Sequence, residues 1–466
     1  MSDDELSQRD LQVLWHPCSQ MRDYDDFLPL PVVGASGGWI ELADGRRLFD
    51  GFSSWWCKSL GHSHPQLMTA LQRQSERFDH VIQANTTNSE VVRLCERLLA
   101  IGNGEPAAVW GQERCPAPGP AASYGKVFLA DSGSMAMEIA MKLALHAQQH
   151  LGRSDRTGFA ALAAGYHGET IATLSVGDCG LYGDPYRSLM FPVTMLQSLP
   201  LRRGPDDPAW QDASAEWPAI EAQLDAVADR LAAICYEPVL QGAGGMRIYS
   251  PDLIRRLRSW ADAHDVFLIA DEIAAGMGRC GTMLAGEWAG DDVRPDFPVV
   301  SKGLTGGALP LSAVLVPQRI YELFLGDYFE FKAFMHSNTW TGNALAVAVA
   351  NAALDVYAGE DILGQVAARG PDLRAGLQEL ASRFPGRLGN IRGVGMMAAA
   401  DLLGCDRRER VGLQVYRAGI EEGLLLRNLG DSIYLFPPLN SSAEECTHLL
   451  SALGRALQRV LDGAAG

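Results

Sequence analysis

The sequence lacks the features that mark secreted, membrane-bound or nucleic-acid-binding proteins. Its 466 residues include nine cysteines but no C-x-x-C pair, so neither a disulfide framework nor a zinc site is predicted. No apolar run is long enough to cross a bilayer, and the start, M-S-D-D-E-L-S-Q-R-D, is acidic and polar, unlike a signal peptide. The formal net charge of −17 argues against binding to nucleic acid, which requires a basic surface. We therefore expect a cytoplasmic protein with reduced thiols.

The remaining composition is that of a globular enzyme, with 47% hydrophobic and 20% charged residues. A chain of this length can bury one large core and a smaller one. Strand-like and helix-like segments alternate over about 200 residues, which predicts a mostly parallel sheet with helices on both faces. From about residue 361 the pattern changes to that of a separate, smaller α+β domain. The Pro/Gly-rich segment 102–124 and the segment 177–216 are predicted to be loops.

Two apolar runs end in chemically unusual residues. V-F-L-I-A-D-E-I (266–273) has the length and composition of a buried strand, with Asp271 at its carboxyl end. V-V-S-K-G-L-T-G-G (299–307) is a shorter run that ends at Lys302, and ammonium groups are rarely buried without a function. Such a pair suits pyridoxal phosphate, which forms a Schiff base with a lysine and needs a carboxylate opposite its ring nitrogen. For these two runs alone, a loop with a solvated lysine is an equally good interpretation.

A third run indicates a phosphate site. The strand K-V-F-L-A-D (126–131) leads through Ser132-Gly133-Ser134 directly into a strongly helical pattern. Small residues at a helix N-terminus leave free N–H groups that bind anions, and the helix dipole favours the negative charge. A simple N-cap by Ser132 or Ser134 is the alternative. Ligands of parallel sheets bind beyond the carboxyl ends of the strands, so this turn and the two earlier strand ends are expected to meet.

Six segments in order carry a family resemblance: D-S-G-S (131–134), G-Y-H-G (165–168), E-P-V-L-Q-G-A-G-G-M (237–246), A-D-E-I-A-A-G-M-G-R (270–279), S-K-G-L-T-G-G (301–307) and T-W-T-G-N (339–343). With these motifs the chain resembles the fold-type I, pyridoxal-phosphate-dependent class III aminotransferases over nearly its whole length. The resemblance implies an α/β fold. A large domain (61–345) would hold a mostly parallel seven-stranded sheet flanked by helices, and a small α+β domain would be built from both termini (1–60 and 346–466).

The resemblance also implies roles toward pyridoxal phosphate. Lys302 matches the lysine that binds the cofactor covalently and moves the substrate proton. Asp271 matches the acid paired with the pyridine nitrogen, which this ion pair keeps protonated. Gly133 and Ser134 match the phosphate-binding turn, and Tyr166 matches the aromatic residue stacked on the ring.

Other matches concern the partner subunit and the surroundings of the cofactor. Thr339 matches the threonine that reaches the phosphate from the neighbouring subunit, so a homodimer with shared active sites is implied. His336, which begins the segment 336–343, has no assigned role. Gln241 resembles the residue near the ring hydroxyl. Arg279 ends another matching motif, where substrate binding and a structural salt bridge are the two interpretations.

On the substrate side, L-W-H-P (14–17) and S-S-W-W (53–56) resemble one branch of the class. Its members transfer an amino group from S-adenosylmethionine to 8-amino-7-oxononanoate in biotin biosynthesis. Two indoles on a loop suit the wall of a ligand pocket, and Trp55 and Trp56 match the pair that lines it. A core position for one of them is the alternative. Arg427 matches the arginine that receives the substrate carboxylate, a task suited to a guanidinium.

Three positions depart from that branch. Cys18 follows W-H-P where a tyrosine stands in some members, so a hydroxyl that could handle the amino donor is missing there. Glu169 replaces an aspartate found in some relatives, and Asn428 stands beside Arg427 where proline is frequent. The donor is therefore open between S-adenosylmethionine, lysine and another ω-amine.

Two other classes of protein are disfavoured. A pyridoxal-phosphate-dependent aminomutase would share the core motifs, but S-S-W-W and W-H-P argue against it. A catalytically idle relative, acting as a binding or structural subunit, would not need Asp271, Lys302 and the phosphate turn intact. The sequence favours an aminotransferase.

Overall fold

The computed structural model describes residues 3–106 and 123–463. Most of the predicted loop 102–124 therefore lies outside the described residues, as does Cys115. The eight described cysteines are all unpaired thiols. Within the described residues, no helix combines the length and the apolar character needed to cross a membrane.

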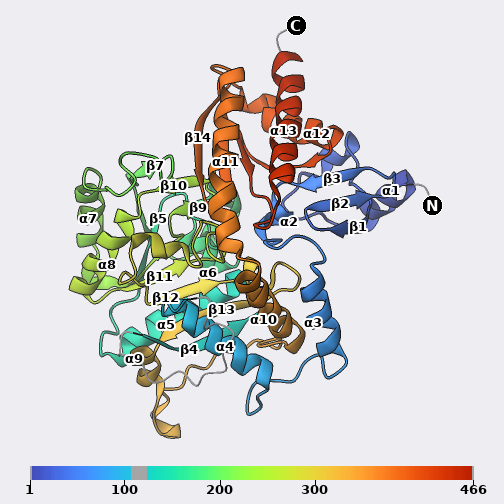
Figure 1. The fold of residues 1–466 in the computed structure, drawn as a ribbon. Helices are drawn as coiled ribbons and strands as arrows, with labels where there is room; N and C mark the ends of the chain where they lie inside the picture. Colours follow the sequence, from blue (N-terminus) through green and yellow to red (C-terminus); the bar gives the residue numbers. More distant parts are fainter. Residues whose placement is uncertain (1–2, 107–122, 464–466) are drawn as a thin grey trace.

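A seven-stranded sheet forms the centre of the larger part of the molecule (Figure 1). In spatial order its strands are β4 (Tyr124–Ala130), β13 (Ser312–Pro317), β12 (Phe297–Val300), β11 (Phe267–Asp271), β8 (Leu231–Tyr236), β5 (Gly158–Leu162) and β6 (Val193–Leu196). β13 runs antiparallel to both of its neighbours, and the remaining pairs are parallel. This confirms the predicted mostly parallel sheet. Every residue of β8, β11 and β12 is buried, as expected for apolar strands covered on both faces.

Helices cover the sheet with their apolar stripes. α5 (Gly133–His150) packs on the four strands β8, β11, β12 and β13, and α8 (Asp252–His264) packs on β11. α10 (Ala344–Gly359) is apolar nearly all round and packs against α3 (Pro65–Ser75) and α4 (Ser89–Gly102). The shorter helices of this region are α6 (Ile171–Val176), α7 (Trp217–Asp225) and α9 (Gln318–Tyr321).

The predicted loop 177–216 is wrong in part, because it contains two strands. One is β6, and the other is β7 (Leu201–Arg202), which forms a small sheet with β10 (Arg247–Tyr249) and β9 (Leu240–Gln241). β6 lies at the edge of the main sheet and is mostly half-buried. An edge strand of four residues lacks the apolar run that identifies the central strands.

Both ends of the chain contribute to one further sheet. The predicted hairpin 39–50 is confirmed as β2 (Trp39–Leu42) and β3 (Arg47–Asp50), and β1 (Val32–Ser36) pairs with β2. β16 (Leu424–Leu425) adds to β3 in parallel, which brings the two ends of the chain together. Figure 1 shows this sheet beside α12 and α13.

A four-stranded sheet follows from the C-terminal pattern. Its strands, in spatial order, are β14 (Leu388–Val394), β15 (Met397–Leu402), β18 (Ser432–Leu435) and β17 (Asn428–Leu429). Three helices accompany it: α11 (Ile362–Arg383), α12 (Val411–Glu421) and α13 (Ala443–Gly463). α11 lies on β14 and β15, and α13 packs against α11 and α12 (Figure 1). The N-terminal helix α1 (Asp3–Val13) precedes the first sheet.

Candidate active site

Two buried acids stand at the carboxyl ends of β8 and β11. Asp271 ends β11, and its two carboxylate oxygens have separate partners. Oδ2 lies 2.8 Å from His167 Nδ1, and Oδ1 accepts a hydrogen bond from the backbone N–H of Ile273 at 3.1 Å. Glu237 follows β8 and accepts from the backbone N–H of Tyr166 at 3.0 Å. The strand ends and the G-Y-H-G segment therefore meet, as predicted from the topology.

Burial and hydrogen bonding set the charges of this cluster. Burial disfavours the charged imidazole of His167, but its hydrogen bond to Asp271 and the charge of that residue outweigh burial and raise the pKa of His167. Burial raises the pKa of Glu237 to about 7. The contact with His167 also fixes the orientation of the Asp271 carboxylate.

Lys302 follows β12 and begins the short turn η7 (Lys302–Thr305) in a left-handed conformation, with φ +35°. Its Nζ lies 5.3 Å from the ring centroid of Trp56, and it forms no salt bridge with a described residue. Burial lowers the pKa of Lys302, although the charges of Asp271 and Glu237 act in the opposite direction. The amine is therefore held close to the acids in a form that loses its proton easily.

The turn between β4 and α5 leaves backbone donors at a helix N-terminus. The Ser132 hydroxyl caps the helix by accepting from Met135 N at 3.4 Å, and the first intrahelical bond runs from Ala136 N to Ser132 O. The N–H groups of Gly133 and Ser134 precede that bond and are available to an anion. The capping interpretation is thus correct for Ser132 and compatible with a phosphate site formed by the next two residues.

The S-S-W-W segment forms a left-handed turn, α2 (Ser53–Trp56), with all four φ angles between +44° and +72°. Each such residue costs about 1–2 kcal/mol relative to the right-handed form. The Ser53 hydroxyl donates to Phe436 O at 2.7 Å, and the Ser54 hydroxyl donates to the buried carboxylate of Asp50, also at 2.7 Å. The two serines therefore hold a strained turn that presents both indoles.

The two indoles have different surroundings. Trp56 is 5% exposed, and its N–H donates to the Tyr434 hydroxyl at 3.2 Å. The core interpretation is thus correct for Trp56, although its ring also faces Lys302. Trp55 is half-buried, and the guanidinium of Arg427 lies over its ring, 4.3 Å from the centroid. Trp55 is the indole that carries a charged neighbour.

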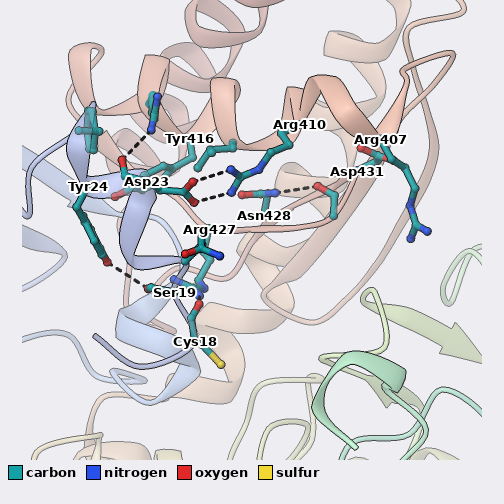
Figure 2. Close-up of a pocket in the computed structure, with 15 residues that line it drawn as sticks. Cys18, Ser19, Asp23, Tyr24, Arg407, Arg410, Tyr416, Arg427, Asn428 and Asp431 are labelled. Carbon is teal, nitrogen blue, oxygen red and sulfur yellow. Dashed lines mark hydrogen bonds and ion pairs between the residues drawn. The ribbon is translucent and has the colours of Figure 1, made fainter. Parts of the chain in front are cut away.

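Arg427 stands at a cavity of about 370 Å³ between the small sheets and residues 3–31, which precede β1 and are called the N-terminal arm. Its Nη2 donates to Cys18 O at 3.0 Å. The charged residues of the cavity wall are Asp23, Asp431, Arg407, Arg410, Arg417 and Arg427. Figure 2 shows Arg427 next to Cys18, and Arg410 paired through both terminal nitrogens with Asp23. Arginines outnumber acids here in a protein of net charge −17, so the cavity favours anions.

A second group of polar side chains lies on the other side of Cys18. Its Sγ is 3.5 Å from the Tyr182 hydroxyl and 4.0 Å from Glu169 Oε1. The Tyr166 hydroxyl donates to the same Glu169 oxygen at 3.0 Å, and its ring meets the Tyr182 ring edge-on at 5.8 Å. Sequence reasoning did not identify Tyr182, because it lies in the segment predicted as a loop and no motif marks it.

Gln241 and Arg279 are both buried. Gln241 Nε2 donates to Ala163 O at 2.9 Å, while its Oε1 has no hydrogen-bond partner among the described residues. Arg279 donates from Nη1 to Met396 O and Pro437 O, both at 2.7 Å, and these bonds connect the large sheet with the small one. Arg279 forms no salt bridge with the described part of the chain. Two backbone carbonyl groups bind it, and not the carboxylate that a structural salt bridge would require.

Thr339 is exposed in the single chain and forms no hydrogen bond with a described residue. Its neighbour Asn338 donates to Asp131 Oδ1 at 3.1 Å. His336, at the start of the segment, lies 2.8 Å from Lys142 Nζ through its Nδ1. The chain on its own therefore does not join Thr339 to the Ser-Gly-Ser turn by a hydrogen bond.

The groups at the strand ends fit pyridoxal phosphate. The buried atoms His167 Nε2 and Gln241 Oε1 have no partner within residues 3–106 and 123–463, and Oε1 can accept from a ring hydroxyl. At Gly168, with φ +127°, a Cβ would collide with the Ser134 hydroxyl, so glycine keeps the turn open. A carboxylate, a lysine amine and a helix N-terminus complete the set that this cofactor needs. The described residues contain no group of three metal-ligating side chains.

Comparison with known sequences connects this geometry with one family. The family model described as "Aminotransferase class-III" matches residues 20–457. The adenosylmethionine-8-amino-7-oxononanoate aminotransferase of Geobacter sulfurreducens is 34% identical over 466 aligned residues, which cover 97% of each chain. The protein of the same name from Nitratidesulfovibrio vulgaris is 36% identical and covers 99% of this chain and 83% of its own.

Solved structures show the same fold. The adenosylmethionine-8-amino-7-oxononanoate aminotransferase of Methanocaldococcus jannaschii superposes with a TM-score of 0.87, at 27% identity, over 98% of this chain and 99% of its own. An amine transaminase from an uncultivated Pseudomonas species, solved in its PLP-bound form, has a TM-score of 0.84 and 31% identity over 96% and 99% of the two chains.

Proposed function

The chain belongs to the aminotransferase class-III family, and from this premise we propose that it transfers an amino group from S-adenosylmethionine to 8-amino-7-oxononanoate, a step of biotin biosynthesis. The names of the bacterial relatives from Geobacter and Nitratidesulfovibrio support this substrate pair, because the similarity extends over nearly the whole chain. An amine transaminase of similar fold supports the wider alternative, a different amino donor.

We infer that pyridoxal phosphate binds at the strand ends. Asp271 would face the ring nitrogen, Lys302 would hold the cofactor covalently, and the N–H groups of Gly133 and Ser134 would bind the phosphate. Tyr166 would cover the ring face. When bound, the cofactor supplies an electron sink that stabilises negative charge at the substrate carbon.

The protein's own contribution to proton transfer lies in two residues. Lys302 accepts a proton at Nζ and returns it, a task for which its lowered pKa is suitable. Asp271 is held in place by His167 Nδ1 at 2.8 Å, and its carboxylate would favour the protonated form of the ring nitrogen that it faces. Gln241 would accept a hydrogen bond from the ring hydroxyl with its free Oε1.

The position of Arg427 is the main observation in support of an amino-group acceptor that bears a carboxylate. Its guanidinium lies over Trp55, is held by Cys18 O and borders an arginine-rich cavity. A planar guanidinium binds a carboxylate through two parallel hydrogen bonds. An elongated acceptor with its amino ketone at Lys302, its chain along Trp55 and Trp56, and its carboxylate at Arg427 fits this order. The carbonyl contacts of Arg279 Nη1 support a structural role, whereas its buried Nη2 has no partner among the described residues and is available to a ligand, so both interpretations of Arg279 stay open.

A homodimer with shared sites is part of the proposal. Thr339 is exposed, although its proposed partner is a phosphate group. The large apolar side chains near it are also exposed: Tyr328 84%, Phe329 81%, Phe331 76%, Met335 86% and Trp340 55%. Such a concentration of exposed apolar area is typical of an interface between subunits. A second copy would cover these residues and bring Thr339 to the partner's phosphate.

The division into domains and the cellular location are also part of the proposal. The division into 1–60, 61–345 and 346–466, with the first and last parts forming one small domain, is supported by the pairing of β3 with β16. A cytoplasmic location is supported by the unpaired state of the described cysteines.

Half-reactions test the function. The purified enzyme with its cofactor is mixed separately with S-adenosylmethionine, lysine and simple ω-amines, and the absorbance of the cofactor is followed as its aldehyde becomes an amine. Conversion by S-adenosylmethionine, reversed by 8-amino-7-oxononanoate, is the expected result. The Lys302→Ala variant serves as the control that cannot carry out either reaction.

Other outcomes identify the alternatives. Conversion by lysine alone keeps the acceptor and changes the donor. Conversion by ω-amines, without reversal by 8-amino-7-oxononanoate, assigns the chain to a broader group of transaminases. Intramolecular movement of an amino group with no net conversion identifies an aminomutase, and the absence of any cofactor absorbance identifies an inactive relative.

A further inference from the structure

The hydroxyl that is missing at Cys18 has a counterpart on another segment. The short turn η3 (Gly180–Tyr182) ends at Tyr182, whose hydroxyl lies 3.5 Å from Cys18 Sγ. The two residues are 164 positions apart in the sequence. A phenol is therefore present at this point of the site, although it comes from the turn that follows α6 and not from the N-terminal arm.

Tyr182 is positioned by the segment that follows β5 (Gly158–Leu162). Asp178, four residues before Tyr182, is bound to two residues that follow β5. Its N–H donates to Gly165 O at 2.8 Å, and its carboxylate accepts from Ala164 N at 2.9 Å. The Tyr182 ring then meets the Tyr166 ring edge-on at 5.8 Å. These contacts fix the hydroxyl next to the aromatic residue proposed to cover the cofactor.

The hydroxyl of Tyr182 is also free to bind a ligand. The Tyr166 hydroxyl is already engaged as a donor to Glu169. In contrast, the Cys18 thiol donates to Tyr182, and no described residue accepts the proton of the Tyr182 hydroxyl. Burial raises the pKa of Tyr182, so the phenol stays protonated at neutral pH and offers both a donor and a lone pair.

The charge beside this hydroxyl indicates the class of ligand. Glu169 is exposed, and no lysine or arginine of the described residues forms a salt bridge with it. An unpaired carboxylate with two phenol rings suits a cationic amino group. Arg427, on the other side of Cys18, suits a carboxylate. Cys18 thus contacts both a group that suits an anion, Arg427, and groups that suit a cation, Glu169 and Tyr182.

We propose that Tyr182 supplies the hydroxyl that Cys18 lacks and, together with Glu169, binds the cationic amino group of the amino donor. This inference rests on the proposed aminotransferase function and names the residue that recognises the donor. A phenol at position 18 and a phenol at position 182 would compete for one space, because only 3.5 Å separates the present sulfur and oxygen atoms. The two positions therefore form an exchangeable pair.

The Tyr182→Phe variant removes only the hydroxyl and is compared with Tyr186→Phe, an exposed tyrosine four positions away in the short turn η4 (Asp184–Leu189). Single-turnover absorbance measurements on the loaded enzyme give an apparent dissociation constant and a limiting rate for each half-reaction. The loss of a hydrogen bond to a charged group raises the dissociation constant of the donor by roughly 10-fold or more. The limiting rate and the acceptor half-reaction should stay within about twofold of the unmodified enzyme and of Tyr186→Phe.

The double variant Cys18→Tyr/Tyr182→Phe tests the exchange. It should regain most of the donor affinity, whereas Cys18→Tyr alone should bind the donor more weakly because the two phenols collide. An unchanged donor constant in Tyr182→Phe overturns the proposal, and so does an equal loss in both half-reactions, which identifies a structural role. The donor measurement uses whichever amine converts the cofactor, so it tests Tyr182 whatever the acceptor is. If 8-amino-7-oxononanoate did not reverse the conversion, the proposed acceptor would be rejected, and the role of Tyr182 would still be decided by the donor constants.

Discussion

The two sides of the candidate active site are built in different ways. On the cofactor side, Glu237, Asp271 and Lys302 follow strands of one sheet, and all three are largely enclosed by it. On the substrate side, Arg427 and Cys18 are 409 positions apart, lie at the surface of the cavity and meet through a single backbone oxygen. One side is built from neighbouring strand ends, and the other from loops of distant segments.

Under the proposed function, this difference separates the chemistry from the choice of substrate. A sheet core transmits strain and tolerates little change, so groups at its strand ends keep one geometry. Loops at the surface vary without loss of the fold and carry specificity in many enzymes. The departures of the sequence at 18, 169 and 428 all lie in such loops or short edge strands. Mutations on the cofactor side should therefore reduce the rate, whereas those on the substrate side should mainly change affinity.

The largest effect is expected for Lys302→Ala. Loss of the amine removes both the covalent attachment and the proton carrier, and proton transfer alone accounts for about 10²–10⁴-fold in rate. Turnover should therefore fall by at least about 10⁴-fold. Borohydride reduction followed by mass spectrometry should label Lys302 in the unmodified enzyme and no residue in the variant.

Lys126→Ala is the matched control, since this lysine is exposed on β4 and lies over the Tyr321 ring. It should keep both the label and the activity. Normal turnover in Lys302→Ala, or labelling of a different lysine, would contradict the assignment.

The next largest effect is expected for Asp271→Asn. A neutral amide cannot stabilise a protonated ring nitrogen, and loss of such a preorganised charge costs about 10²–10³-fold in turnover. The pH dependence changes as well. Burial places the pKa of Lys302 below its ordinary value of 10.5, while Asp271 opposes this shift. Cofactor attachment to the apoenzyme should therefore have its midpoint below pH 10.5, and lower still in Asp271→Asn.

Asp296→Asn provides the comparison for a buried acid outside the site. Asp296 precedes β12 at the opposite end of that strand and pairs with Arg258 and Arg319. Its replacement should lower the melting temperature, while turnover per folded molecule stays within about threefold. For Asp271→Asn itself, a rise in the pH midpoint of cofactor attachment would show that the Asp271 carboxylate does not stabilise the ammonium group of Lys302.

The cofactor side could be predicted from the sequence because its signals are local. Apolar runs that end in Asp271 and Lys302, and a strand that leads through small residues into a helix, each indicate a strand end. The rule that ligands bind at the carboxyl ends of parallel strands then joins them. The mostly parallel sheet follows from the same alternation, and the strand of this sheet that was missed, β6, lies at its edge.

The substrate side could not be predicted in this way. The contact of Cys18 with Tyr182, and that of Arg427 with Trp55, depend on where loops from different domains come to rest. No sequence periodicity indicates such contacts. The left-handed turn at 53–56 likewise depends on the side chain of Asp50 and the backbone of Phe436, which hold its two serines. Family resemblance predicted roles for Arg427 and the tryptophans, but it carried no information on Tyr182.

A smaller effect, on affinity, is expected for Arg427→Lys. An ammonium cannot form the two parallel hydrogen bonds of a guanidinium, and a bond to a charged group contributes about 1.5–3 kcal/mol. The KM for 8-amino-7-oxononanoate should rise roughly 10- to 100-fold, with kcat changed by less than about threefold. The methyl ester of the acceptor is the control, because it lacks the charge. It should be a poor substrate of the unmodified enzyme, and the variant should lose no further affinity for it.

The smallest effect is expected for Asp23→Asn in the arm. Asp23 lies in the short turn η1 (Met21–Asp25) and accepts two hydrogen bonds from Arg410 at 2.7 and 2.6 Å. These bonds, and to a lesser degree the nearby charges, lower the pKa of Asp23 below its ordinary value of 3.8. Folding therefore gains stability from this carboxylate above that pH and loses it as the pH falls further. Because the Arg410 side chain is 51% exposed, the free energy of unfolding should fall by no more than about 1 kcal/mol, and less in high salt.

The consequence for function should nevertheless be measurable. The arm carries Cys18, whose carbonyl oxygen holds Arg427, so a looser arm should raise the KM for the acceptor about two- to threefold. Thermal unfolding at several pH values and steady-state kinetics on the same preparation test both statements. If Asp23→Asn lowered turnover as much as Asp271→Asn does, the arm would belong to the catalytic core, and the separation between a sheet that performs the chemistry and loops that select the substrate would not hold.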